Sequence, residues 1–142
     1  MCSRVEVNVA PNTKSQTLLR SSAETIQDCS LVERESALEL VIRRHGLTIS
    51  ITVPNDVQEW FVDVEDSHAG MKAHDWCDYA GYDSRTAEQQ DRDMAEDLKS
   101  FVISVSTNPL RMRAADRKNA NAVLEWQADG EWTRAVPANQ HP

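Results

Sequence analysis

The feature that most constrains the fold is a long amphipathic segment past the middle of the chain. Thr86, followed three residues later by Gln89, fits a capping box at the start of a helix, and Asn108-Pro109 interrupts the pattern at its end. Between these signals, apolar residues recur at steps of four, three, one and three. They are Met94, Leu98, Phe101, Val102 and Val105. This spacing predicts a helix over residues 86–106 with one buried stripe.

Two stretches that precede this helix predict antiparallel hairpins. Residues 47–53 alternate strictly between aliphatic and hydroxyl side chains, and residues 37–43 lead into them through a turn that ends at Gly46. Residues 58–65 also alternate, and residues 71–79 return after the small, polar loop 66–70. Two consecutive hairpins make a four-stranded antiparallel meander.

The register of the second hairpin decides which side chains share a face. Pairing Val64 with Lys72 places Trp60 opposite Trp76 on the buried side and Phe61 opposite Asp75 on the other side. A slip of one residue would move Trp76 to the opposite face.

The rest of the chain is patterned less clearly. Val5, Val7 and Val9 indicate a strand, whereas residues 13–35 are polar, and a short helix at 22–29, a loop and a further strand all remain open there. Three more strands are expected after the helix, at residues 110–114, 123–127 and 132–136, the last two joined by a tight turn at Asp129-Gly130.

These elements predict an α+β fold, in which an antiparallel sheet of consecutive hairpins packs against one long amphipathic helix and further C-terminal strands follow. A length of 142 residues, an apolar fraction of 40% and four Trp favour one folded domain over residues 1–142. We expect residues 1–3 and 137–142 to be flexible ends.

Charge and cysteine usage narrow the class of protein. The net charge of −8 is concentrated in residues 55–97, where thirteen acids face three bases. This excess disfavours nucleic acid as a partner and permits a basic protein partner. The alternative is that the acidity only keeps a small protein soluble. The three cysteines lack metal-ligand spacing, and neither a signal peptide nor a membrane-length apolar run is seen, which predicts a cytoplasmic protein with no membrane contact. The pattern leaves monomer and homodimer open.

The residues that could carry chemistry do not form a recognisable catalytic motif. On a strand, His74 and Asp78 lie on one face and Asp75 and Cys77 on the other, which is too few ligands on either side for a metal. A nucleophile elbow, a phosphate loop and a dinucleotide fingerprint are all missing. We therefore predict no cofactor, no metal and no enzymatic activity. The alternative is a small carboxylate-dependent hydrolase that uses acids and His of hairpin 58–79.

The predicted binding site is the outward side of the same hairpin. If Trp60 faces the core, Phe61 faces outward among carboxylates, as an apolar anchor within a charged rim would. The predicted partner-binding residues are Glu59, Phe61, Asp63, Glu65, Asp75 and Tyr79. The alternative is that residues 1–36 cover this face and bury Phe61 in a second small core.

Three parts of the chain carry a resemblance of character: the stretch Glu59-Trp60-Phe61-Val62-Asp63-Val64, the stretch Asp75-Trp76-Cys77-Asp78-Tyr79 and the acidic helix. Together they resemble the immunity proteins of bacterial polymorphic toxin systems. Those proteins are short, acidic and cytosolic, and they bind and block a cognate toxin, often a nuclease with a basic active site. The resemblance covers about a third of the chain and implies a toxin domain as partner. It assigns no role to an individual residue.

Overall fold

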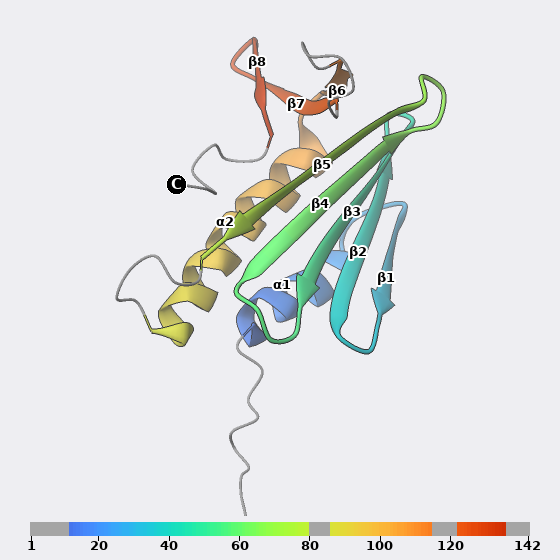
Figure 1. Ribbon diagram of the computed structural model, residues 1–142. Coiled ribbons are helices and arrows are strands. Elements are labelled where there is room, and N and C mark those ends of the chain that lie inside the picture. The colour runs from blue at the N-terminus through green and yellow to red at the C-terminus, as the bar shows by residue number, and fades with distance from the viewer. Residues whose placement is uncertain (1–11, 80–85, 115–121, 136–142) are drawn as a thin grey trace, which may run out of the picture.

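The computed structural model describes residues 12–79, 86–114 and 122–135. In these residues, two helices lie on one face of a five-stranded sheet, and a three-stranded sheet lies across one end (Figure 1). The elements in chain order are α1 Thr13–Ala23, β1 Cys29–Glu33, β2 Ala37–Arg44, β3 Leu47–Pro54, β4 Glu59–Asp66, β5 Met71–Asp78, α2 Ala87–Thr107, β6 Leu110–Arg113, β7 Val123–Ala128 and β8 Glu131–Arg134. The predicted α+β class and its C-terminal strands are confirmed.

The five-stranded sheet is an antiparallel meander in the order β1-β2-β3-β4-β5. Both predicted hairpins are present, and β1 adds one strand that the sequence left open. The turn between β2 and β3 consists of His45 and Gly46, with φ angles of 57° and 78°. Positive φ at both central residues matches the right-handed twist of the flanking strands, and this two-residue turn fixes their register.

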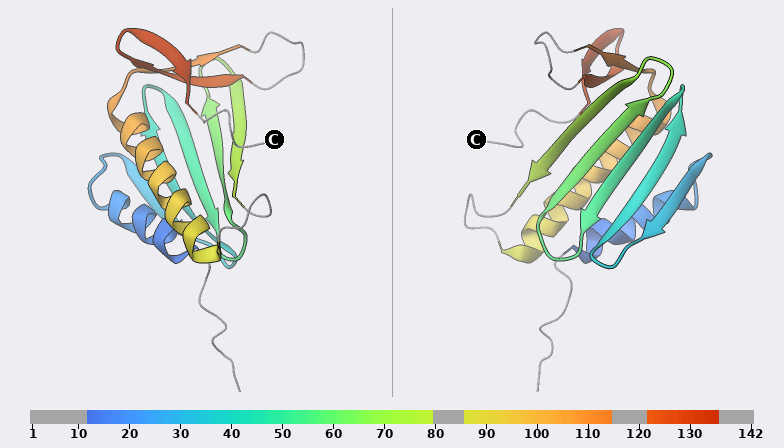
Figure 2. Two further views of the ribbon diagram at one scale, coloured as in Figure 1. Left: turned by 90° about the vertical axis from the view of Figure 1, so that its left-hand side faces the viewer. Right: turned by 45° about the vertical axis from the view of Figure 1, so that its right-hand side comes forward.

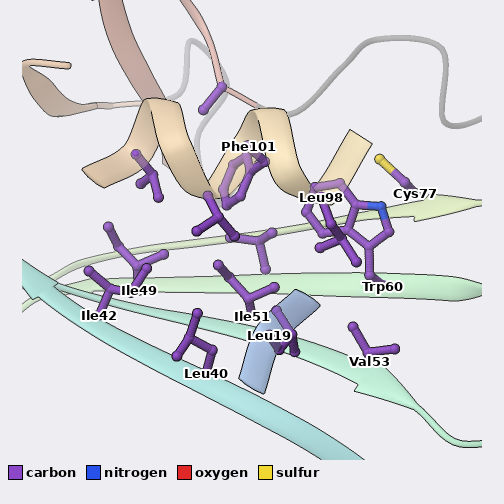
Figure 3. Close-up of a cluster of buried hydrophobic side chains, with 14 of the residues drawn as sticks. Leu19, Leu40, Ile42, Ile49, Ile51, Val53, Trp60, Cys77, Leu98 and Phe101 are labelled. Carbon is purple, nitrogen blue, oxygen red and sulfur yellow. The ribbon is translucent and has the colours of Figure 1, made fainter. Parts of the chain in front are cut away.

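Helix α2 forms as predicted. The Gln89 backbone N–H donates to Thr86 Oγ1 (3.1 Å), and the Thr86 N–H donates to Gln89 Oε1 (2.8 Å), which completes the capping box. All five residues of the predicted stripe are at most 3% exposed. They pack on the face of the sheet that both helices cover, which we call the inner face (Figure 3). There, the ring of Phe101 lies 5.1 Å from that of Trp60.

Helix α1 was not predicted, and its tertiary contacts explain why. Its N-cap residue, Asn12, donates its side-chain amide to the carbonyls of Pro54 and Val57 and does not cap its own helix. The cap comes from α2, because the Asp91 carboxylate accepts the backbone N–H groups of Lys14 (2.8 Å) and Ser15 (3.2 Å). Asp91 also accepts the Ser15 hydroxyl (2.7 Å) and is buried. A cap supplied from 76 residues away leaves no local signal in the sequence.

The predicted register of the β4–β5 hairpin is wrong by one residue. Val64 pairs with Ala73, so Trp60 lies opposite Cys77 and Phe61 lies opposite Trp76. The cause is the loop, which has four residues and not five, because Asp66 pairs with Met71 and belongs to β4. As the strand period requires, this slip moves every side chain of β5 to the face opposite the predicted one.

The C-terminal strands form a separate sheet in the order β6-β7-β8 that lies against the end of α2 and the edge of β5. The Asp129-Gly130 turn forms as predicted, with φ angles of 54° and 81°. Trp126 packs on Phe101, with ring centroids 5.7 Å apart, and Leu124 joins the same apolar cluster as the inner face of the large sheet. The predicted Val5–Val9 strand and the predicted flexible ends lie outside the described residues.

Candidate functional site

The face of the sheet opposite the helices, here called the outer face, is the candidate binding surface. In the described part of the chain neither helix covers it, and in the right-hand view of Figure 2 both helices lie behind the sheet. Strands β2 and β3 present mostly hydroxyl and charged side chains there, such as Thr48 and Ser50. The aromatic side chains of this face come from β4 and β5.

Three rings make up what we call the aromatic cluster: Phe61, His74 and Trp76. Phe61 and Trp76 are directly opposite each other in a pair without mutual backbone hydrogen bonds, where cross-strand side chains approach most closely. The rings of Phe61 and His74 are stacked, with centroids 6.3 Å apart and planes inclined by 22°. The His74 and Trp76 centroids are 6.0 Å apart. Phe61 and Trp76 are partly buried and His74 is exposed, so the rings present apolar surface on an open face.

Carboxylates border this cluster along β4. The nearest is Asp63, whose Oδ1 lies 2.7 Å from Nδ1 of His74. Glu65 follows on the same face and lies opposite Lys72. An open depression next to the cluster is lined in part by these four side chains and by Ser50. The carboxylates on this side of the cluster are therefore partly balanced by the ammonium group of Lys72.

At the other end of the cluster, two carboxylates face each other across the strands. Glu59 lies opposite Asp78. Burial raises the pKa of the Glu59 carboxyl above its usual value, and the charge of Asp78 raises it further. Ionisation of Glu59 is therefore less favourable in the folded protein than in the unfolded chain.

The structure places four of the six predicted binding residues on the outer face, namely Glu59, Phe61, Asp63 and Glu65. The expected positions of Asp75 and Tyr79 are wrong. With the corrected register, Asp75 lies on the inner side of β5 and forms an ion pair with Arg134 of β8.

Tyr79 is buried and belongs to the core. Its hydroxyl donates to Asp97 Oδ2 of α2 (2.6 Å) and accepts the Trp60 indole N–H (3.1 Å). Burial raises the pKa of this phenol, and the hydrogen bond to Asp97 raises it further. The hydroxyl therefore stays protonated and links the inner side of the sheet to α2.

Sequence reasoning missed Trp76 and His74 as members of the outer face. The missed signal is at Asp66, whose side chain accepts the backbone N–H groups of His68 (3.0 Å) and Ala69 (3.1 Å). An aspartate that bonds the backbone two and three residues onward is a turn-initiating residue at the end of a strand. Assigning Asp66 to β4 shortens the loop and gives the observed register.

The polar side chains of the outer face are not arranged for nucleophilic catalysis. Ser50 pairs with Asp63, and Asp63 pairs with His74, so the carboxylate lies between the hydroxyl and the imidazole. A nucleophile needs the base beside it, with the carboxylate behind the base. Burial raises the pKa of the Cys77 thiol to about 12, which suppresses its thiolate. Among the described residues, no group of three His, Cys, Asp or Glu is placed to hold a metal.

The described acids of segment 55–97 do not all share one surface. On the strands, Glu59, Asp63, Glu65 and Asp78 lie on the outer face, whereas the exposed acids of α2, such as Glu88 and Glu96, belong to the helix layer behind the sheet. The aromatic cluster lies among the strand carboxylates.

No protein family model, curated protein or solved structure matches this chain. In the described ranges, neither α1 nor α2 combines the length and the apolar character that a membrane span requires.

Proposed function

We propose that this protein is a non-catalytic cytoplasmic binding protein that holds a basic protein partner against the outer face of its sheet. We propose further that the partner is a bacterial toxin domain, as it is for the immunity proteins that the sequence resembles. The observation that carries the proposal is the aromatic cluster, in which Phe61 and Trp76 occupy directly opposite positions on a face that no described element covers and that carboxylates border.

The aromatic pair suits the role of an anchor. Aromatic side chains contribute a large apolar area with few rotatable bonds, so little conformational entropy is lost when a partner covers them. Both rings already pack against the ring of His74, and their strand positions are fixed opposite each other. Binding would therefore remove apolar surface from water at a small ordering cost, which is typical of residues that dominate interface energies.

The surrounding carboxylates suit the role of a steering rim. Asp63 and Glu65 are exposed, so their field is screened over about 8 Å at physiological salt. Exposed charges act mainly on the association rate and on the choice of partner. A basic partner surface matches their sign, and hydroxyl side chains of β3 offer further hydrogen bonds beside them.

Identification of the partner comes first. We expect a pull-down from the native organism to retain one basic protein with the purified chain, and a large secreted toxin to be encoded immediately upstream of its gene. Recovery of metabolic enzymes alone, together with a place in a metabolic operon, would count against the proposal.

Charge reversal tests the steering role. We expect Asp63→Lys with Glu65→Lys to slow association with the captured partner about tenfold or more and to flatten its salt dependence. The matched control is Glu88→Lys with Glu96→Lys, which makes the same change of net charge on the exposed side of α2. Stopped-flow or surface-binding kinetics at several salt concentrations measure both. Equal slowing by the two pairs would show that only net charge matters.

Truncation tests the anchor. We expect Phe61→Ala and Trp76→Ala each to weaken binding by about 2 kcal/mol or more, mainly through faster dissociation. Ile103→Ala is the control, because Ile103 is a 52% exposed apolar residue on α2, away from the outer face. Circular dichroism verifies that each variant is folded. Unchanged dissociation in both aromatic variants would place the interface elsewhere, with the acidic side of α2 as the next surface to examine.

The alternative function, a small carboxylate-dependent hydrolase, has weaker support. The raised pKa of Glu59 opposite Asp78 is the kind of shift that a general acid shows. However, both carboxylates lie on an open sheet face, where water screens a developing charge, and catalytic carboxyl pairs work in sites that exclude water.

A further inference from the structure

The two edges of the large sheet differ in how they are covered. At β5, the Ala122 N–H donates to the Lys72 carbonyl (2.9 Å), and the Trp76 N–H is taken by the Asp75 side chain (3.0 Å). The C-terminal sheet thus approaches this edge. At the other edge is β1, and no described strand pairs with its outer side. An apolar strand with an uncovered edge is a template for pairing with another strand.

The hydrogen-bond pattern identifies the outward backbone groups of β1. The Arg34 N–H donates to the Ala37 carbonyl, and the Arg43 N–H donates to the Asp28 carbonyl. Because hydrogen-bonded pairs alternate along an antiparallel ladder, Ser30 and Val32 are also bonded to β2. The backbone groups of the other three residues point away from the sheet. They are Cys29, Leu31 and Glu33.

We propose that β1 pairs with β1 of a second copy of this chain, antiparallel and about a two-fold axis at Leu31. This register pairs all three outward residues. Leu31 lies opposite Leu31 of the second copy, and Cys29 of each copy lies opposite Glu33 of the other. The three pairs form about six backbone hydrogen bonds. An axis at Ser30 or Val32 would leave one of the three unpaired on each copy. The self-complementary register therefore centres on Leu31.

Charge complementarity supports a second copy as the occupant. Residues 1–54 hold six acids and six bases, so this edge belongs to the balanced part of an otherwise acidic chain. In the proposed register, Asp28 of one copy lies opposite Arg34 of the other, on the outer side of the sheet. Arg34 already bonds Glu39 (2.7 Å), so it would bridge two carboxylates. A strongly basic or strongly acidic strand would find no such match.

Side-chain packing at the junction agrees with this register. Leu31 is partly buried and packs against the core cluster on the inner side, where its counterpart would extend the apolar contact. The outer face stays uncovered, because the new contact is made at the edge. The dimer would therefore carry two aromatic clusters on one continuous ten-stranded sheet.

The first experiment measures molecular mass. Sedimentation equilibrium of the full chain should show a reversible monomer–dimer transition. Glu33→Pro removes an outward donor, and Glu33→Ala keeps it, while both lose the ion pair of Glu33 with Arg20. We expect Glu33→Pro to raise the dimer dissociation constant at least about tenfold above that of Glu33→Ala. Equal constants for the two variants, or a mass that stays monomeric at every concentration, would overturn the proposal.

The second experiment fixes the register without removing a backbone donor. In a Cys2→Ser background, Glu33→Cys places a thiol opposite Cys29 of the second copy. Within one chain, these positions are about 13 Å apart along the strand, which is too far for a disulfide. Mild oxidation should give a dimer in which peptide mapping finds Cys29 joined to the introduced cysteine. A monomer whose Leu31 amide is as protected from hydrogen exchange as that of Val32 would show instead that the chain covers its own edge, and it would refute the dimer.

Discussion

The inner and outer faces of the large sheet are built from the same strands, yet they differ in almost every physical property. On the inner face, Leu40, Ile42, Ile49 and Ile51 are completely buried beneath the helices. On the outer face, their immediate neighbours are mostly hydroxyl and charged residues, and β4 and β5 add one cluster of rings. Burial on the inner face supplies most of the free energy of folding, so the outer face can hold partly exposed aromatic side chains at little cost to stability. We propose that these exposed rings bind a partner.

The largest expected effect comes from removing volume under the inner face. Leu98 is completely buried, so Leu98→Ala should lower the free energy of unfolding by about 2–5 kcal/mol, as large-to-small core changes do. On the outer face, Phe61→Ala should cost only about 1 kcal/mol, because Phe61 is partly exposed and mainly loses a cross-strand contact. Urea denaturation measures both. A larger loss from Phe61→Ala would mean that Phe61 belongs to a second core.

An intermediate loss of stability is expected when the buried polar contact between α1 and α2 is removed. Asp91→Ala removes the acceptor for two backbone N–H groups of α1 and leaves buried donors without a partner. We expect a loss of about 1–3 kcal/mol, with early hydrogen exchange over α1. Glu96→Ala on the exposed side of the same helix is the control and should change stability by no more than about 0.5 kcal/mol. Equal losses would show that Asp91 does not anchor α1.

The smallest expected effect is a pH-dependent change in stability. Its sign should be opposite for a carboxyl of the outer face and a carboxyl of the C-terminal sheet. The pKa of Glu59 is raised, chiefly by burial, so its ionisation destabilises the folded state. Glu59→Gln should therefore increase stability slightly at pH 7, within about 0.5 kcal/mol. This gain should fade as the pH falls below about 4, where the carboxyl is protonated in both states.

Glu125 of β7 is the control for Glu59, because its pKa is shifted in the opposite direction. Hydrogen bonds from Arg113 (2.9 Å) and Arg111 (2.8 Å) lower the pKa of its carboxyl. Its ionised form stabilises the folded state above the unfolded pKa, and this contribution is lost as the pH falls through the folded pKa. Glu125→Gln should consequently destabilise the protein at pH 7. Thermal unfolding across pH 3–7 compares the two variants, and shifts of the same sign would contradict the assignment.

Local patterns predicted those elements whose physics is local. The stripe from Met94 to Val105 and its capping box needed only helical spacing, and the alternation from Leu47 to Val53 needed only the two-residue period of a strand. The turn at Asp129-Gly130 was predictable because few residue pairs tolerate positive φ at both positions. The sequence by itself therefore determined the α+β class, α2 and seven of the eight strands that the structure describes.

The tertiary structure decided what depends on contacts between distant residues. Helix α1 is capped by Asp91 across 76 residues, so its own polar sequence carries almost no signal. The register of β4–β5 depends on one turn, and its shift exchanged Asp75 for His74 and Trp76 on the outer face. The same shift turned Tyr79 inward, where its hydroxyl donates to Asp97 of α2. Period-two alternation shows that a strand has two faces, but only the pairing of strands decides which side chains meet on each.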